Sequence, residues 1–152
     1  MPGRPYKRPE SVLVVVYTLK AEVLMMRRIR PKHFWQSVTG SMAWGESAGQ
    51  AARRELYEET GIMAGDRLIN LQQQVEFPIL PDWRARYAAT ARTNREHWFA
   101  LQLPSRRIPR LQLDEHSEYR WVPYDQALRL ASSWTNRKAI RYLLTGSATS
   151  YR

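Results

Sequence analysis

Short apolar runs alternate with polar turns along much of the chain, as they do in strands joined by tight connections. Residues 12–17 form an almost wholly aliphatic run, and residues 23–26 form a second one after a polar turn around Lys20. These two runs predict neighbouring strands near the start of the chain. Later apolar and aromatic runs predict further strands at residues 35–38, 68–77, 97–103 and 119–122.

The pattern changes to that of a helix between residues 47 and 59. Ser47 can cap the first turn, Gln50 completes a capping box, and Gly61 stands where a left-handed residue would end the helix. One face has small residues and a leucine that can lie close against a sheet: Ala48, Ala51, Ala52 and Leu56. The other face is acidic.

Two further helices are predicted near the end of the chain, at residues 123–131 and 135–144. Strands interspersed with a few helices predict an α/β (α+β) fold, in which helices cover the faces of a mixed sheet. Residues 78–95 contain two prolines and several arginines without a clear period, so they predict a long loop or a partly ordered arm. No repeat or linker divides the sequence, and we predict a single domain over residues 1–152.

Charge and composition narrow the classes of partner. The 24 Lys and Arg residues exceed the 14 Asp and Glu residues by ten, which favours a small molecule that carries phosphate. The arginines are spread along the chain, so nucleic acid is the less favoured partner. No apolar run reaches the ~18 residues of a membrane span, and the run at residues 12–17 is too short for a signal peptide. The absence of cysteine excludes disulfides and thiolate metal sites and fits a reducing cytoplasm.

Three glutamates of the first predicted helix stand at positions i, i+3 and i+4. Glu55, Glu58 and Glu59 therefore share one face, where their like charges repel one another. A divalent cation would remove that repulsion, and carboxylate-rich sites suit Mg²⁺ or Mn²⁺. As a metal ligand, Glu59 is expected at the surface, where it contributes charge and not core packing. On the helix alone, three solvated glutamates would be the simpler interpretation.

The surrounding residues decide between these interpretations. Residues 40–62 read GSMAWGESAGQAARRELYEETGI. This segment resembles the Nudix box, which is Gly, five residues, Glu, seven residues, Arg-Glu, an apolar residue, one residue, Glu-Glu, one residue, Gly and an apolar residue. All seven fixed identities of the box are present: Gly40, Glu46, Arg54, Glu55, Glu58, Glu59 and Gly61.

The resemblance implies the Nudix fold, in which a loop–helix–loop element lies against a mixed sheet between helices, and it implies hydrolysis of a phosphoanhydride bond. It also implies Mg²⁺, with Mn²⁺ as the alternative, held mainly by Glu55 and Glu59. Glu58 and Glu46 would complete or support the site, and Arg54 would orient a glutamate through an ion pair. The cation would offset charge in the transition state and help to position or deprotonate the attacking water.

Phrases outside the box give a narrower resemblance. One branch of the family, the bacterial dihydroneopterin triphosphate diphosphatases, has phrases similar to YKRPESVLVVVY at 6–17, FWQSVTGSM at 34–42, VEF at 75–77, DEHSEYRWV at 114–122 and SSWTNRKAI at 132–140. This resemblance implies release of pyrophosphate from 7,8-dihydroneopterin 3′-triphosphate, a reaction of folate synthesis.

The matched phrases also imply site residues outside the box. Six residues are expected to contact substrate: Lys7, Arg28, Thr39, Phe77, Ile79 and Ser133. Glu115 resembles the acidic residue that joins the metal site or acts as the base, and Asp114 and Glu118 are its rivals. Trp35 is expected either in the pocket or in the core. His116, beside Glu115, is a candidate proton carrier.

Two alternatives remain at the level of sequence. A general deoxynucleoside triphosphate pyrophosphatase would use the same metal site with a different ring pocket, and residues 42–44 lack the acidic residues usual at that place in the box. A non-catalytic Nudix domain would bind a nucleotide or nucleic acid, but this chain keeps every glutamate of the box. The sequence leaves open the number of metal ions, the general base and the oligomeric state.

Overall fold

The first long apolar run becomes the central strand of the sheet. The computed structural model describes residues 6–144 and places strand β1 (Glu10–Thr18) between other strands. Its residues 11–16 are all buried. A strand is buried on both faces only when both faces of the sheet are covered, so this aliphatic run requires helices on each side.

The described part of the chain contains seven strands, three α-helices and two 3₁₀-helices. After β1 they follow in the order β2 (Glu22–Arg28), β3 (Trp35–Gln36), β4 (Val38–Ser41), α1 (Ala48–Thr60), η1 (Gly65–Arg67), β5 (Ile69–Pro78), η2 (Pro81–Arg86), β6 (Thr93–Leu103), β7 (His116–Pro123), α2 (Tyr124–Leu130) and α3 (Trp134–Leu144).

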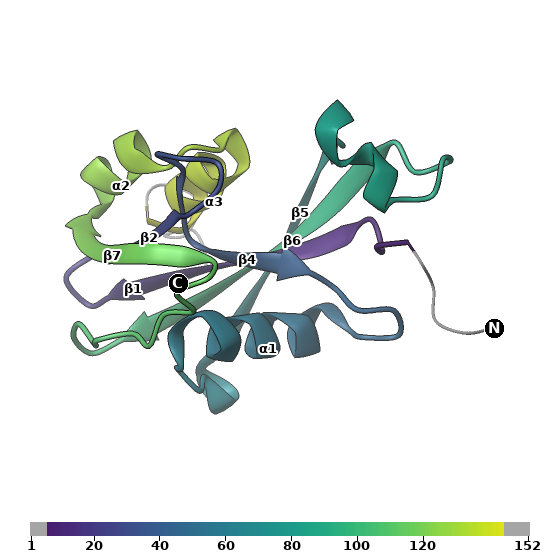
Figure 1. Ribbon diagram of the computed structural model, residues 1–152. Coiled ribbons are helices and arrows are strands. Elements are labelled where there is room, and N and C mark those ends of the chain that lie inside the picture. The colour runs from purple at the N-terminus through teal and green to yellow at the C-terminus, as the bar shows by residue number, and fades with distance from the viewer. Residues whose placement is uncertain (1–5, 145–152) are drawn as a thin grey trace.

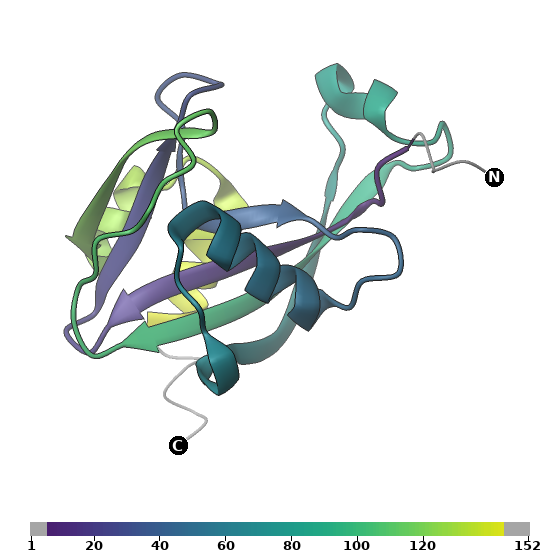
Figure 2. The same cartoon turned by 60° about the horizontal axis from the view of Figure 1, so that its bottom comes forward.

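The strands form one mixed sheet with the order β3-β2-β1-β6-β5, in which β4 also pairs with β1 and β7 also pairs with β2. Strands β1 and β6 are parallel, in a register that runs from Glu10 opposite Arg95 to Thr18 opposite Leu103. The other strand pairs are antiparallel. Figure 2 shows β1 and β6 side by side behind α1, so residues distant in sequence meet at the centre of the fold.

Alternate residues of β1 enter two separate hydrophobic cores. Val12 and Val14 lie in the core that contains Leu56 of α1. Leu13 and Val15 lie in the core that contains the buried residues of α2 and α3. The sheet therefore lies between α1 on one face and α2 with α3 on the other (Figure 1), which confirms the predicted fold class.

Local signals at α1 are also confirmed. Ser47 Oγ accepts the N–H of Gln50 at 3.1 Å, and Gln50 Oε1 accepts the N–H of Ser47 at 2.9 Å, which completes the capping box.

The predicted domain over residues 1–152 extends past residues 6–144, so its two ends lie outside the described residues.

One local prediction is wrong: residues 35–38 do not form one strand, because β3 pairs with β2, β4 pairs with β1, and the N–H of Ser37 between them donates to Asn136 Oδ1 of α3. For residues 78–95 the structure agrees with the partly ordered arm and not with the long loop, because they include η2 and the first residues of β6. Within residues 6–144, no helix is both long and apolar enough to span a membrane.

Candidate active site

The placement of α1 over the sheet is fixed by its smallest residues and by its two ends. Ala51 and Ala52 are fully buried in the core beneath the helix. Ser47 caps the first turn, and Gly61 ends the helix with a φ of 75° while its N–H donates to the carbonyl of Tyr57. Because the packed face and both ends are fixed, the directions of the glutamates on the remaining face are fixed as well.

Arg54 joins the loop before α1 to these glutamates. Its Nε and Nη2 each donate at 2.8 Å to the carboxylate of Glu46, one to each oxygen. Its Nη1 donates to Glu58 Oε1 at 3.2 Å and lies 3.5 Å from Glu55 Oε1. Both oxygens of Glu46 are thus engaged by Arg54, and this geometry favours the supporting role implied for Glu46 over direct coordination of a metal.

Glu55 lies directly over Gly40 of β4. A Cβ at position 40 would overlap the Glu55 carboxylate, so glycine is the residue that leaves room for it. The pKa of Glu55 is raised to about 8: burial is the largest cause and Glu58 adds to it, whereas the charge of Arg54 opposes the rise. Glu55 is therefore largely protonated at neutral pH until a cation replaces the proton.

Glu59 is buried, contrary to the expectation that it lies at the surface. The residue is only 3% exposed, and its Oε1 has no hydrogen-bond partner among the described residues. Burial raises the pKa of Glu59 well above its usual value, and the charges of Glu55 and Glu115 raise it further, while the backbone N–H of Thr39 lowers it. Helical spacing placed Glu59 on the same face of α1 as Glu55, but it did not show how closely β4 approaches the helix and buries Glu59.

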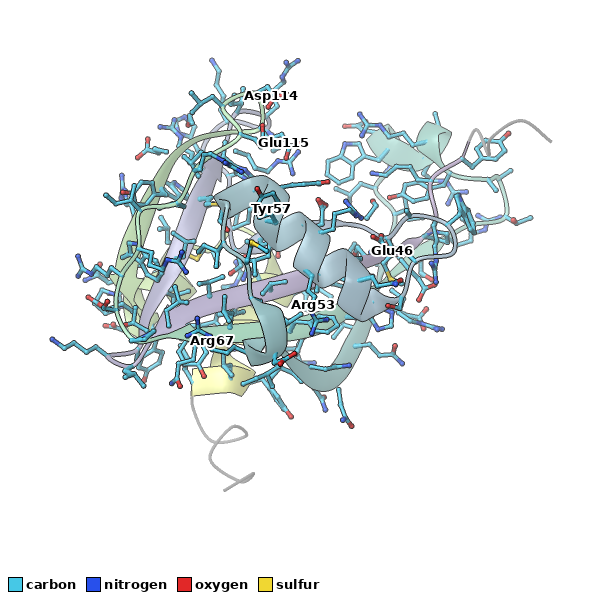
Figure 3. All side chains as sticks on the ribbon, turned by 90° about the horizontal axis from the view of Figure 1, so that it is seen from below. Glu46, Arg53, Tyr57, Arg67, Asp114 and Glu115 are labelled. Carbon is cyan, nitrogen blue, oxygen red and sulfur yellow. The ribbon has the colours of Figure 1, made fainter. Side chains whose placement is uncertain are left out.

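Glu115 reaches the same region from the loop that precedes β7. Its N–H donates to the carbonyl of Gln112 and its own carbonyl accepts the N–H of Ile29, both at 2.9 Å, which fixes the loop beside the end of β2. Figure 3 shows Glu115 beyond the half of α1 that carries Tyr57, and Glu46 near the opposite end of the helix.

The two sequence rivals of Glu115 are placed differently. Glu118 on β7 accepts a hydrogen bond of 3.0 Å from Arg27, and Asp114 lies in the exposed loop next to Glu115 (Figure 3). The charge of Glu115 acts on both Glu55 and Glu59 and raises the pKa of each. This electrostatic link supports Glu115 as the third acidic residue of the site.

The chemistry of these carboxylates fits a divalent cation. Considering residues 6–144, no three Asp, Glu or His side chains converge closely enough to hold a metal ion together in this conformation. The mutual electrostatic effects of Glu55, Glu59 and Glu115 nevertheless put them in one neighbourhood. Carboxylates that repel one another separate until a cation draws them together, and the unpartnered oxygen of Glu59 is a buried acceptor that a cation would satisfy.

Cationic side chains face the glutamates. Burial lowers the pKa of Lys7 and the charges of Arg86 and Arg28 lower it further, while the charge of Glu55 raises it. The N–H of Lys7 also donates to the carbonyl of Arg86 at 2.8 Å, which joins the N-terminal segment to η2. The structure thus places Lys7 within electrostatic reach of Glu55, and Arg28 within reach of Lys7 and Glu59, while their contacts with substrate stay predictions. It adds Arg86, which no local signal within residues 78–95 had distinguished from surface charge.

The other expected contacts are more dispersed. Thr39 is next to Gly40, and its Oγ1 donates to the carbonyl of Val12 at 3.0 Å. Phe77 is half-buried at the end of β5, and Ile79 is buried just beyond it. Ser133 Oγ accepts the N–H of Asn136 at 3.0 Å and so caps α3. The roles of Phe77, Ile79 and Ser133 at the substrate stay predictions.

Two further residues are assigned by their burial. Trp35 is only 7% exposed and belongs to the core beneath α2 and α3, where Arg120 covers its ring at 4.6 Å from the centroid. His116 is buried, with its Nε2 3.1 Å from Nε2 of Gln36. Burial lowers the pKa of His116 to about 4, so the ring is neutral at neutral pH and is poorly suited to carry a proton there.

Comparison with known proteins agrees with this geometry. Residues 7–143 match the model of the NUDIX domain. The chain belongs to the Nudix family. Among the relatives of this Nudix protein, the dihydroneopterin triphosphate diphosphatase of Escherichia coli (strain K12) is 43% identical over 152 residues, which is 97% of this chain and 100% of that protein. The diphosphatase of the same name from Haemophilus influenzae is 36% identical and covers 91% of this chain and 89% of its own.

A solved structure gives the same relationship. The E. coli dihydroneopterin triphosphate pyrophosphohydrolase matches this Nudix protein with a TM-score of 0.83 and 43% identity, covering 93% of this chain and 98% of its own. The fixed positions of the Nudix box have physical reasons in the present fold. Gly40 leaves room for Glu55, and Gly61 ends α1. The ion pair of Glu46 with Arg54 holds the loop before α1 against the helix.

Proposed function

We propose that this Nudix protein uses Mg²⁺ to hydrolyse dihydroneopterin triphosphate to the monophosphate and pyrophosphate. Two relatives named as diphosphatases of that compound, at 43% and 36% identity, match this chain over nearly its whole length and support this substrate. The placement of charges in the site supports the reaction class independently.

The observation that carries the proposal is the meeting of acidic side chains, of which Glu59 is buried, Glu55 partly buried and Glu115 exposed, with cationic side chains. Glu55, Glu59 and Glu115 form an acidic group in which one buried oxygen has no partner among the described residues. Lys7 and Arg28 lie within electrostatic reach of that group. A polyanion alone would be repelled by the carboxylates, and a cation alone would be repelled by Lys7 and Arg28. A phosphate chain that carries a divalent cation satisfies both.

Each group then has a distinct task. Glu55, Glu59 and Glu115 would hold Mg²⁺, which supplies neutralisation of phosphate charge and activation of water. Lys7 and Arg28 bind phosphate oxygens and orient the chain for attack, with Arg86 beside them.

The remaining predicted residues surround this centre. Arg54 and Glu46 hold the first turns of α1 in place, while Glu58, half-exposed and bonded to Arg54, and Glu115 are the candidates for taking the proton of the attacking water. Lining of the substrate pocket is proposed for four residues: Thr39, Phe77, Ile79 and Ser133.

The proposal is tested by a rate comparison with Mg²⁺ on dihydroneopterin triphosphate and on the four common deoxynucleoside triphosphates. Pyrophosphate and orthophosphate are assayed separately, because cleavage between the α- and β-phosphates releases pyrophosphate while stepwise removal of the terminal phosphate releases orthophosphate. We expect pyrophosphate as the product and the highest kcat/KM on the pterin compound.

A higher kcat/KM on a deoxynucleotide would overturn the substrate and retain the chemistry. Absence of turnover on every compound, in protein that binds Mn²⁺, would overturn the hydrolase assignment and favour a binding domain.

A further inference from the structure

Arg8 makes four hydrogen bonds that join the sheet to the loop before α1. Its Nε and Nη2 donate to Glu10 Oε1 at 3.0 and 2.8 Å, and its Nη1 donates to the carbonyls of Ala43 and Glu46 at 3.0 and 2.8 Å. The side chain is only 20% exposed. One planar guanidinium therefore bridges the start of β1 and both ends of the turn at residues 43–46.

The sheet end of this bridge is rigid. Glu10 opens β1, and its second oxygen, Oε2, lies 2.9 Å from Nε2 of His97 on the neighbouring strand β6. The carbonyl of Glu10 also accepts the N–H of Met42 at 2.9 Å. Arg8 is thus anchored on a carboxylate that is itself fixed between two strands.

The loop end of the bridge leads directly to the glutamates of α1. Within the turn, Glu46 N–H donates to the carbonyl of Ala43, and Ala43 N–H donates to Glu46 Oε1. The Glu46 carboxylate then holds Arg54, which in turn contacts Glu55 and Glu58. A displacement of the turn would move Glu46 and would carry Arg54 away from both glutamates.

We propose that Arg8 is a positioning residue, which holds the turn at residues 43–46 so that Glu46 and Arg54 keep the acidic face of α1 in the arrangement needed to bind the cation and hydrolyse substrate. This role rests on the proposed function. This role differs from that of the neighbouring Lys7, since the guanidinium of Arg8 donates its hydrogen bonds to Glu10 and to two backbone carbonyls and needs no contact with phosphate.

The test compares Arg8→Ala and Arg8→Lys with Arg53→Ala as the matched control. Arg53 also donates to two backbone carbonyls, those of Gly49 and Gly65, and stands next to Arg54. We expect Arg8→Ala to lower kcat about 10-fold or more, because a small misplacement of reacting groups is costly, while KM changes less than about twofold. Arg8→Lys keeps the charge but not the planar fork, so it should keep most of the defect. Arg53→Ala should match the wild type.

Two readouts do not depend on turnover. Amide hydrogen exchange of Ala43, whose N–H is bonded to Glu46, should accelerate about 10-fold or more in Arg8→Ala while the amides of β1 keep their protection. Mn²⁺ titrated without substrate should bind several-fold more weakly. The thermal midpoint of each variant verifies that the fold is retained.

A double-mutant cycle locates the effect. Glu46→Ala keeps the backbone carbonyl that Arg8 contacts but removes the carboxylate that holds Arg54. If Arg8 acts through this carboxylate, Arg8→Ala should lower kcat by less than about twofold in the Glu46→Ala background, because coupled residues are not additive.

Additive losses would overturn the proposal. A raised KM with unchanged kcat in Arg8→Ala, together with a wild-type KM in Arg8→Lys, would also overturn it, since that pattern identifies a charge that binds substrate. Unchanged amide exchange of Ala43 in Arg8→Ala would overturn it as well. If the wild type hydrolysed nothing, the proposed function would fail, while the exchange and Mn²⁺ measurements would still decide the role of Arg8.

Discussion

Glu59 places a conflict between stability and function at a single residue. Its Oε1 is buried without a partner among the described residues, and leaving such an acceptor unsatisfied costs about 1–3 kcal/mol. Packing alone would favour an apolar residue of similar size at this position. A cation that reached this oxygen would offset the cost, so the atom that weakens the metal-free fold would strengthen the proposed metal binding.

Replacement of Glu59 should separate these two effects. We expect Glu59→Gln to lower kcat by roughly 10³-fold, equivalent to about 4 kcal/mol, because a metal ligand is lost. The metal-free protein should keep or raise its thermal midpoint, because a neutral amide is buried without the proton uptake on folding that the raised pKa of Glu59 requires. Steady-state kinetics and thermal unfolding in EDTA measure the two effects. Glu118→Gln, which weakens the ion pairs of Glu118 with Arg27 and Arg120, is the control and should keep the wild-type rate. A near wild-type rate for Glu59→Gln would remove Glu59 from the site.

Gly40 gives a second prediction at the scale of one residue. Gly40→Ala adds a Cβ where the Glu55 carboxylate now lies, so Glu55 must move away. We expect Mn²⁺ affinity and kcat to fall at least about 10-fold, and stability to fall by about 1–3 kcal/mol from overpacking. The control is Gly49→Ala, in α1, where the added atom meets only the end of the Arg53 side chain and where alanine favours a helix. Equal metal affinity in Gly40→Ala and wild type would contradict the placement of Glu55 over Gly40.

At the scale of elements, the sequence predicted what depends on neighbouring residues and missed what depends on distant pairings. Helix α1 was predicted to within one residue at each end because its cap, Ser47, and its terminating Gly61 are local signals. The burial of Glu59 was missed, because it arises from the approach of β4 to the helix.

The composition of the candidate site was only partly predictable for the same reason. The parallel pairing of β1 with β6, which helps to bring the N-terminal segment against η2 and its Arg86, leaves no periodic trace in the sequence. Lys7 and Glu115 were found by resemblance to a family, not by pattern. Arg8 had no signal at all, because its partners are mostly backbone carbonyls and a carboxylate outside the box.

The capping box of α1 gives a prediction at the scale of the element. Ser47→Ala removes the acceptor for the N–H of Gln50 and should lower the free energy of unfolding by about 1 kcal/mol. For a chain of this size, that corresponds to a fall of about 2–4 °C in the thermal midpoint. Ser105→Ala, in an exposed loop, is the control and should change the midpoint by less than about 1 °C. If calorimetry gave Ser47→Ala and Ser105→Ala the same thermal midpoint, the cap would contribute nothing to the stability of α1.

At the scale of the whole molecule, an excess of positive charge surrounds a small group of carboxylates that hold protons tightly. The net charge is +10, yet burial and mutual repulsion raise the pKa of Glu55 to about 8 and that of Glu59 well above its usual value. Cation binding must therefore displace protons, which makes metal affinity and stability depend on pH together.

The interval from pH 6.5 to 8 isolates this effect. Below it, His116, whose pKa burial lowers to about 4, gives a dependence of the opposite sign, since its unfolded form gains a proton first. Between pH 6.5 and 8, unfolded glutamates are ionised, while Glu55, with a pKa of about 8, releases its proton only across this interval in the metal-free fold. Glu59, whose pKa burial raises well above its usual value, acts in the same direction. The folded state then binds more protons than the unfolded state, so its stability falls as pH rises.

We expect denaturant titrations in EDTA to show the free energy of unfolding falling by on the order of 1 kcal/mol from pH 6.5 to 8. The free energy of unfolding that Mg²⁺ adds, its increment over the value in EDTA, should grow from pH 6.5 to 8, because fewer protons then compete for the carboxylates. The double variant Glu55→Gln/Glu59→Gln removes both titrating groups, so it should lose the fall in EDTA and most of the Mg²⁺ increment. Two outcomes for the wild type would contradict this prediction: a metal-free stability that is flat or rises with pH across this interval, and a stabilisation by Mg²⁺ that shrinks with pH. Either would show that Glu55 and Glu59 are already ionised in the fold and that no proton is exchanged for the cation.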